Sequence, residues 1–319
     1  MRIPLFFTRF YNSFGKTNSR ILPLDKKIAL LEKLDIPLLR ELEKSEKDGK
    51  LKKGTVKEFL ADLDGIKRWT KRQEIMTETE TPDSLLFQER DDPELYETDL
   101  DHVIEMEKMA AMLFDSGEFP SISQTFSAKK VKDGIFVHDG GEIGVGDTTH
   151  ADETYWKENR TERKAKEHLS FTEFFRFRIS LKGLGGKTSS DLYQSYFDEE
   201  FELNKDGQLV VLLDHLQAII YGVDHIYPYE PIYQTPEALV YYLTTYLIDP
   251  FEVLMRSAAL PVQNEFLVFM QKMLPLHTIE DSYKEAIARK RLKEQDGILL
   301  VSTARSTLTA FYQSPKLLQ

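Results

Sequence analysis

The stretch "FELNKDGQLVVLLDHL" (residues 201–216) decides the fold, because its apolar residues have helical spacing. Strict alternation of apolar and polar residues would indicate a strand, whereas apolar residues at i, i+3, i+4 and i+7 indicate a helix with one buried face. The pattern here follows the second rule and continues beyond the stretch, at Leu209, Leu212, Leu213, Leu216, Ile219 and Ile220. The sequence therefore predicts one helix that begins near Leu209, within a mainly α-helical chain.

The residues in front of this helix resemble an EF-hand, in which a calcium loop of about twelve residues joins two helices. In the loop 202–213, Asn204 and Asp206 stand at positions 3 and 5, where EF-hands place oxygen ligands. Gly207 stands at position 6, where the loop turns sharply, and Leu209 stands at the apolar position 8. "SDLYQSYFDEEF" (190–201) would be the incoming helix.

Related patterns recur elsewhere in the chain. "HLSFTEFFRF" (168–177) resembles the second half of an EF-hand, with Leu169 at position 8 and Glu173 at position 12, and Leu169 precedes Leu209 by 40 residues. "EKSEKDGKLKKGTVKEFL" (43–60) and, more faintly, "EQDGILLVSTARSTL" (294–308) repeat parts of the pattern. The resemblance to the EF-hand family implies paired helix-loop-helix lobes, the arrangement of calmodulin-like proteins.

The same loops lack part of the ligand set that calcium needs. Calcium takes about six to eight oxygens, and the carboxylate at position 12 supplies two of them. In the loop 202–213, position 12 is Leu213, and in the loop 162–173 basic residues stand where oxygens should be. We therefore expect no metal site and no cofactor. If calcium did bind, its ligands would come from the degenerate loop positions Glu202, Asn204, Asp206 and Glu173.

A second motif competes for the same region. "SLKGLGGKTSS" (180–190) resembles the phosphate loop of ParA/MinD-type ATPases, and that resemblance implies that Lys187 would contact phosphate and Asp214 would be the acid beside the metal ion. The loop departs from the family at Leu184, which replaces one of its paired glycines. The helical periodicity after Leu209 also argues against the strand that this fold needs before Asp214.

The rest of the chain predicts further helices and one hairpin. Apolar spacing indicates helices over 27–44, with a kink at Pro37, and over 55–69, 99–114 and 235–255. Two short apolar runs flank Asp139-Gly140-Gly141 in "GIFVHDGGEIGV" (134–145), which predicts a β-hairpin. The expected fold class is mainly α, with EF-hand-like paired lobes, a small β-hairpin and an extended acidic connector.

The expected domain organisation has five segments along the chain. They are a mitochondrial targeting or anchoring segment (1–24), an N-terminal helix-loop-helix (25–70), an acidic connector with one helix and a hairpin (71–165), an EF-hand-like pair (166–225) and a C-terminal helical region (226–319).

Composition and the first residues point to a location and to a class of partner. "MRIPLFFTRFYNSFGKTNSR" (1–20) is basic, free of acids and amphipathic as a helix, which is typical of a mitochondrial leader and could also bind a membrane surface. The net charge of −11 argues against a nucleic-acid surface. The absence of Cys excludes disulfides and thiolate metal sites, and no apolar run reaches the roughly 20 residues of a transmembrane helix.

Catalytic motifs are absent from the sequence. His138, His150 and His168 lie near acids but without a recognised metal spacing, so we expect surface histidines. The expected function is a non-catalytic accessory subunit of a mitochondrial complex, either the respiratory chain or ATP synthase, at the matrix or inner-membrane periphery. Its expected partners are other protein subunits. The alternatives are a calcium-responsive EF-hand regulator, similar to the gatekeepers of mitochondrial calcium uptake, and a ParA-like ATPase.

Overall fold

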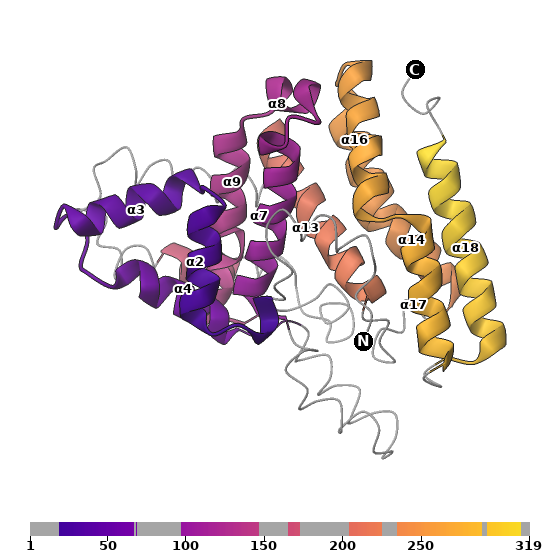
Figure 1. The fold of residues 1–319 in the computed structure, drawn as a ribbon, viewed down its shortest axis with the longest axis horizontal. Helices are drawn as coiled ribbons and strands as arrows, with labels where there is room; N and C mark the ends of the chain where they lie inside the picture. The colour runs from indigo at the N-terminus through magenta and orange to yellow at the C-terminus, as the bar shows by residue number, and fades with distance from the viewer. Residues whose placement is uncertain are drawn as a thin grey trace, which may run out of the picture.

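The protein is mainly α-helical, as the sequence predicted. The computed structural model describes residues 19–66, 68, 97–146, 165–172, 204–224, 235–288 and 292–313. Figure 1 shows the N-terminal helices on one side, the C-terminal helices on the other, and α7, α9 and α13 between them. Among the described residues, no helix is both long and apolar enough to cross a lipid bilayer.

The N-terminal part contains a short 3₁₀ turn and three helices: η1 (Ser19–Ile21), α2 (Leu24–Lys33), α3 (Pro37–Lys47) and α4 (Thr55–Gly65). The expected kink at Pro37 is a complete break. Pro37 is the first residue of α3, where its missing N–H leaves no helical hydrogen bond unmade. The chain turns between α2 and α3 through Asp35, whose φ is 58°.

The central part contains the elements that carry the candidate site: α7 (Asp99–Asp115), α8 (Pro120–Thr125), α9 (Ala128–Val137), the 3₁₀ helix η3 (His138–Gly144) and α13 (Lys205–Asp224). Helix α7 contacts α2, α4, α9 and α13, and α13 also contacts α9, α15 and α17. Elements from four of the expected segments therefore share one apolar core, which includes Val103, Phe136 and Leu213.

The C-terminal part is helical almost throughout its described residues: α14 (Pro236–Leu243), the π-helical turn η5 (Thr244–Ile248), α15 (Asp249–Met255), α16 (Leu260–Met273), α17 (Leu276–Ala288) and α18 (Glu294–Tyr312). The predicted helix 235–255 is thus present with a π turn in its middle. That turn ends just before Pro250, which cannot donate a backbone hydrogen bond. The faint repeat at 294–308 lies inside α18.

The predicted hairpin at 134–145 is wrong, and the described residues contain no β-strand. The run "GIFV" forms the last turn of α9, and "HDGGEIG" forms η3. A short apolar run fits a buried helix as well as a strand. The glycines allow close packing instead of a hairpin turn: a Cβ on Gly140 would lie 3.1 Å from the ring of Phe171, and one on Gly144 would lie 2.3 Å from the hydroxyl of Ser170.

The expected calcium loop 202–213 is helical where the structure describes it. Residues 205–213 of the expected calcium loop are the start of α13. Asn204 accepts hydrogen bonds from the backbone N–H groups of Asp206 and Gly207, at distances of 3.0 and 3.1 Å, and so caps the first turn of the helix. An asparagine that caps a helix and an asparagine that binds calcium can occur in the same local sequence pattern. Glu202 and Glu173 lie outside the described residues.

Other sequence predictions have mixed outcomes. Helices α4, α7 and α13 confirm the predicted helices 55–69, 99–114 and the one that begins near Leu209, each within a few residues. The helix-loop-helix around 43–60 is present as α3 and α4. Residues 1–18, 69–96 and the candidate phosphate loop 180–190 lie outside the described residues.

Candidate metal centre

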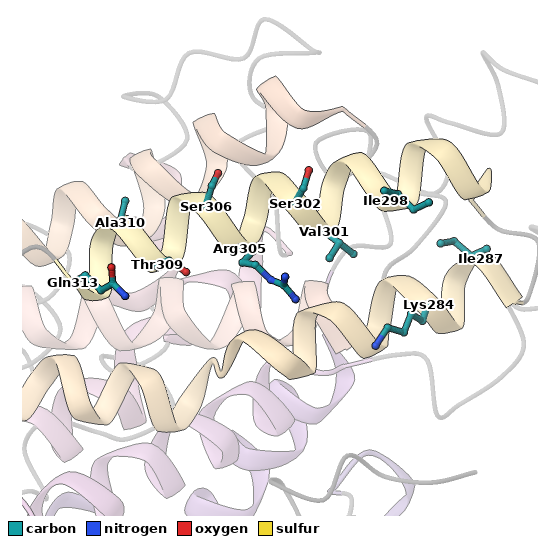
Figure 2. Close-up of a pocket in the computed structure, with 10 residues that line it drawn as sticks. All are labelled: Lys284, Ile287, Ile298, Val301, Ser302, Arg305, Ser306, Thr309, Ala310 and Gln313. Atoms are coloured by element: carbon teal, nitrogen blue, oxygen red, sulfur yellow. The ribbon is translucent and has the colours of Figure 1, made fainter.

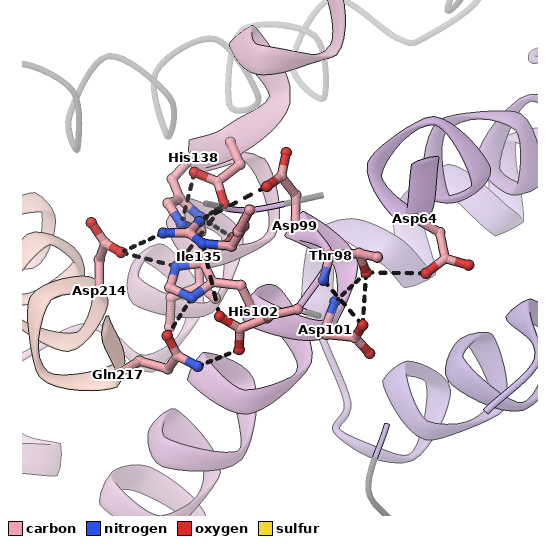
Figure 3. Close-up of polar contacts among 12 residues, drawn as sticks. Asp64, Thr98, Asp99, Asp101, His102, Ile135, His138, Asp214 and Gln217 are labelled. Carbon is pink, nitrogen blue, oxygen red and sulfur yellow. Dashed lines mark hydrogen bonds and ion pairs between the residues drawn. The ribbon is translucent and has the colours of Figure 1, made fainter. Parts of the chain in front are cut away.

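Four side chains from three elements meet between the central helices: His102 of α7, His138 and Asp139 of η3, and Asp214 of α13. Figure 3 shows His102, His138 and Asp214 of this set close together. The candidate ligand atoms of His102, His138 and Asp139 all lie within 4.8 Å of one another. His102 Nε2 is 2.9 Å from Asp214 Oδ1, and His138 Nε2 is 3.2 Å from Asp139 Oδ1. We call these four residues the His-Asp cluster.

Local structure sets the position of each residue. Thr98 and Asp101 form a capping box at the start of α7, and His102 follows in the first turn of that helix. Helix α9 begins at the Ser127 cap and ends at Val137, so that η3 presents His138 and Asp139 at its first two positions. Helix α13 passes beside both elements and contributes Asp214.

Both histidines point a ring nitrogen into the cluster. His138 Nδ1 lies 2.7 Å from the carbonyl oxygen of Ile135, which can only accept, so Nδ1 carries the proton and Nε2 carries a lone pair. His102 Nδ1 lies 2.6 Å from Oε1 of Gln217. The Nε2 atoms of both rings are buried. His102 Nε2 pairs with the Asp214 carboxylate, whereas the Nε2 lone pair of His138 faces Asp139 without a hydrogen bond.

Arg68 brings a positive charge to the edge of the cluster. Its backbone N–H donates to the carbonyl of Glu97 at 2.9 Å, and the N–H of Asp99 donates to the carbonyl of Ile66 at 3.1 Å, so the chain around Arg68 is fixed against the start of α7. Its guanidinium donates to Asp139 Oδ2 at 3.0 Å, and its Nη2 is 4.0 Å from Asp214 Oδ1.

The carboxylates of the cluster stabilise positive charge on His102. Burial and the Arg68 cation lower the pKa of His102, but Asp214 and Asp139 outweigh them, and the net pKa is raised. Burial raises the pKa of Asp214, but His102 and the other histidines hold it well below its ordinary value. For His138, burial dominates and lowers the pKa. The lowered pKa of Asp214 favours its ionised form, and the lowered pKa of His138 favours its neutral imidazole.

The residues fit a divalent transition metal ion. Imidazole nitrogens suit zinc, iron, nickel and copper, and carboxylates suit manganese and magnesium, so a mixed set of two histidines and two aspartates suits zinc, manganese or iron. Metal-bound histidines usually donate their other N–H to a carbonyl, carboxylate or water, as His138 does to Ile135. The Asp214 side chain is 26% exposed, so the cluster can be reached from solvent on that side.

Part of this set could be predicted from the sequence, for other reasons. His138 is buried, so the expectation of a surface histidine is wrong for this residue. Asp214 was named as a metal-side acid for a phosphate loop, and it lies in the cluster. His168 is half-buried and outside the cluster, and His150 lies outside the described residues. His102, Asp139 and Arg68 were missed. The adjacent His138 and Asp139, directly after an apolar helix, were the sequence signal that could have indicated this cluster.

A second candidate site is the groove between α17 and α18, with a volume of about 720 Å³ (Figure 2). Its walls include the apolar Ile287, Ile298 and Val301, and Figure 2 shows Arg305 of α18 directed towards α17. Arg305 pairs with Glu280, and Lys284 pairs with Asp281. The groove contains no cluster of acids and histidines, so we place the candidate chemistry at the His-Asp cluster.

Comparison of the chain with protein-family models, curated proteins and solved structures finds no match. The function must therefore be argued from the side chains of the His-Asp cluster and from the residues that hold them.

Proposed function

We propose that this protein is a divalent-metal-dependent hydrolase that acts on small phosphate esters. The observation that carries the proposal is the convergence of two buried imidazoles, His102 and His138, on the carboxylates of Asp139 and Asp214. His138 Nε2 is a buried polar atom without a hydrogen bond, and such an atom is costly and can mark the site of an absent ion. A cation between these four residues would satisfy the nitrogens and the carboxylates together.

His102, His138, Asp139 and Asp214 would hold the ion. A divalent ion there supplies Lewis-acid chemistry, because it stabilises negative charge on a substrate oxygen and lowers the pKa of water. Four side chains leave coordination positions free for water and substrate if the ion takes five or six ligands. Burial of His102 and His138 excludes bulk water from the other sides of the site.

Arg68 supports the choice of a phosphate ester. A guanidinium presents a planar fork of donors that matches phosphate oxygens, and it stays charged at all physiological pH values. Arg68 lies at the edge of the cluster, where its Nη1 already donates to the carboxylate of Asp139. An anionic substrate at the metal centre would lie within reach of this cation and would be oriented by it.

The test is metal-dependent hydrolysis of p-nitrophenyl phosphate, a simple phosphate monoester. Protein stripped with a chelator should be inactive and should recover activity with Mn²⁺, Co²⁺ or Zn²⁺. Asp139→Asn keeps the size of the side chain, and it should lower activity by more than about 100-fold, beyond what the loss of an outer-sphere partner costs. The matched control is Asp133→Asn, which removes another buried carboxylate outside the cluster and should keep the metal-dependent activity.

Two results would contradict parts of this proposal. Full activity after metal removal, or no metal binding by the wild-type protein, would reject the metal centre. Metal-dependent hydrolysis of p-nitrophenyl acetate but not of p-nitrophenyl phosphate would keep the hydrolase and reject the role of Arg68 in phosphate recognition.

The accessory-subunit hypothesis stays a prediction, and one observation favours a surface partner. Large apolar side chains are exposed on several C-terminal helices, including Tyr241 (63%), Leu260 (59%) and Ile298 (60%). Such residues are common at protein interfaces when they are contiguous. Native electrophoresis of mitochondrial extracts tests this second candidate: migration with a respiratory complex or ATP synthase would support it, and migration near the 37.1 kDa of the single chain would reject it.

A further inference from the structure

We propose that the groove between α17 and α18 binds the anion of a medium-chain carboxylic acid, with the acyl tail on the apolar end of the groove and the carboxylate at Arg305. The groove is formed by the C-terminal helices (Figure 2). No residue of the His-Asp cluster lines it, so the inference stands apart from the proposed metal centre.

One end of the groove is apolar. Ile287 of α17 and Ile298 and Val301 of α18 line this end, and Figure 2 shows Ile287 and Ile298 facing each other there. Gly297 allows Ile287 to pack against the first turn of α18, because a Cβ at residue 297 would lie 2.4 Å from Ile287 Cδ1. Ile298 is large and apolar but 60% exposed, so covering it with an apolar ligand would be favourable.

The charged residues that line the groove are both basic, Lys284 and Arg305. Arg305 Nε donates to Glu280 Oε1 at 2.9 Å, and Nη2 donates to the same oxygen, so the guanidinium is held in place. Its Nη1 makes no hydrogen bond with the described residues, and Figure 2 shows the side chain directed towards α17. A guanidinium with a donor to spare fits a carboxylate.

The acids beside the two cations limit the contribution of the head group. Lys284 Nζ bonds Asp281 on its own helix at 3.1 Å, and Glu280 pairs with Arg305. These acids offset part of the positive charge. We therefore expect the cations to select an anion over a neutral head group, while the apolar tail supplies most of the affinity.

The dimensions of the groove favour a single acyl chain over a helix. Ile298 and Gln313 are separated by about 22 Å along α18, at a rise of about 1.5 Å per residue. A volume of about 720 Å³ over this length gives a mean cross-section of about 30 Å², whereas a helix about 10 Å across needs about 80 Å². An extended peptide is narrower, but its N–H and C=O groups would face the apolar end without partners. An acyl tail has no such groups.

The positions of the cation and the apolar end set the length of the tail. Arg305 follows Ile298 by seven residues, which is about 10 Å along the helix. A medium-chain acid spans this distance with its carboxylate at Arg305 and its last carbons between Ile287 and Ile298.

The variants separate the head group from the tail. Arg305→Gln removes the cation, and Arg40→Gln is its control, because Arg40 is also 59% exposed and also pairs with an acid, Asp35 of the N-terminal part. Ile298→Ser removes the tail contact. Its control is Leu299→Ser, because Leu299 is the next residue of α18 and is 53% exposed, but does not line the groove. All four side chains are exposed, and circular dichroism checks that each variant is folded.

The measurement is isothermal titration calorimetry of the full chain with decanoate below its micelle concentration, with decanol as the neutral ligand and acetate as the anion without a tail. We expect the wild type to bind one decanoate, to bind decanol about 5-fold more weakly and not to bind acetate. Arg305→Gln should lower the affinity for decanoate about 5-fold and leave that for decanol unchanged. Ile298→Ser should lower both affinities about 5-fold, and the two control variants should match the wild type.

Three results would overturn the inference. A wild type without saturable decanoate binding would show that the groove does not take an acyl anion. Equal affinities for decanoate and decanol would reject the role of Arg305. Equal losses in Leu299→Ser and Ile298→Ser would show that the ligand covers the exposed apolar surface of α18 and not the groove.

Discussion

Lys27 is a buried cation that ties the start of α7 to the N-terminal helices. Its Nζ donates to Asp64 of α4 at 2.6 Å and to Asp101 of α7 at 2.9 Å, and Lys27 and Asp101 are only 3% and 1% exposed. A buried ion pair contributes little net stability, but removal of one partner leaves an uncompensated charge. Asp101 belongs to the capping box next to His102, so this contact also supports the candidate metal centre.

We expect Lys27→Met to destabilise the protein by about 3 kcal/mol, because it leaves Asp101 buried without its cation. Urea unfolding followed by circular dichroism measures the change. The control is Lys57→Met, which removes an exposed ion pair with Asp25 and should leave the midpoint unchanged. Equal midpoints for the Lys27 variant and the wild type would show that the buried pair has no such role.

The residues of the candidate site were harder to predict than the helices because their partners are remote in sequence. Gln217 is 115 residues from His102 and 120 residues from Glu97. No local spacing links such residues, and only the packing of α7 against α13 brings them together. His138 and Asp139 were adjacent and visible, but a hairpin reading placed them in a turn. Polar residues on an otherwise apolar helix face, such as His102 in α7, were the signal that could have been used.

The first turn of α7 is the element on which the site depends most directly. Thr98 Oγ1 accepts a hydrogen bond from the N–H of Asp101 at 3.2 Å, and the Asp101 carboxylate accepts from the N–H of Thr98 at 3.2 Å. The Thr98 hydroxyl is also 3.1 Å from Asp64. Thr98 thus fixes both the start of the helix and its orientation against α4.

Thr98→Ala should lower stability by about 1 kcal/mol or slightly more, the usual effect of losing a helix cap. The hydroxyl can be tested alone with Thr98→Ser, which keeps the cap and should retain most of the stability. Thermal unfolding of the two variants beside the wild type makes the comparison. If serine and alanine are equally destabilising, the methyl group rather than the capping bond matters at this position.

At the scale of elements, the periodicity of apolar residues predicted most of the helices. It failed where a short apolar run fits either a helix or a strand. Leu209 to Ile220 gave a long periodic pattern, and α13 is present there. Pro37 was expected to bend one helix, but Asp35 adopts a positive φ and the chain begins a new helix. The two glycines after Asp139 were read as a turn, whereas Gly140 permits close contact with Phe171. The role of a glycine depends on its neighbours in space.

The whole molecule contains a buried carboxyl group that affects its stability as pH changes. Glu107 of α7 is fully buried, and neither of its carboxyl oxygens has a hydrogen bond. Burial raises its pKa well above the ordinary value; Lys132 opposes this, and Asp133 and Asp115 add to it. Lys132 itself bonds Asp115 and the carbonyl of Leu34, so it is satisfied without Glu107.

A carboxyl group with a raised pKa in the folded state binds its proton more tightly when folded, so its contribution to stability is lost as pH rises above the pKa of the unfolded chain. We therefore expect Glu107→Gln to be more stable than the wild type at neutral pH and similar to it near the ordinary glutamate pKa. Unfolding free energies measured across this pH range test the prediction. A difference between the two proteins that does not change with pH would contradict it.

At the scale of the whole molecule, the mainly α fold class could be predicted from the sequence, but the packing of the helices could not. The apolar faces of α7, α9 and α13 were visible as patterns, yet nothing local specified that they would pack on one another. That arrangement creates the His-Asp cluster. The candidate metal centre is therefore a consequence of long-range packing.

The most direct test of that claim is the metal content of the protein. Purified protein, stripped with a chelator and dialysed against Mn²⁺, Co²⁺ or Zn²⁺, should bind one ion at a site that Asp139→Asn and Asp214→Asn both remove, as measured by elemental analysis against protein concentration. Asp133→Asn should retain the ion. No bound ion in the wild type, or an ion that both cluster variants retain, would contradict the metal centre.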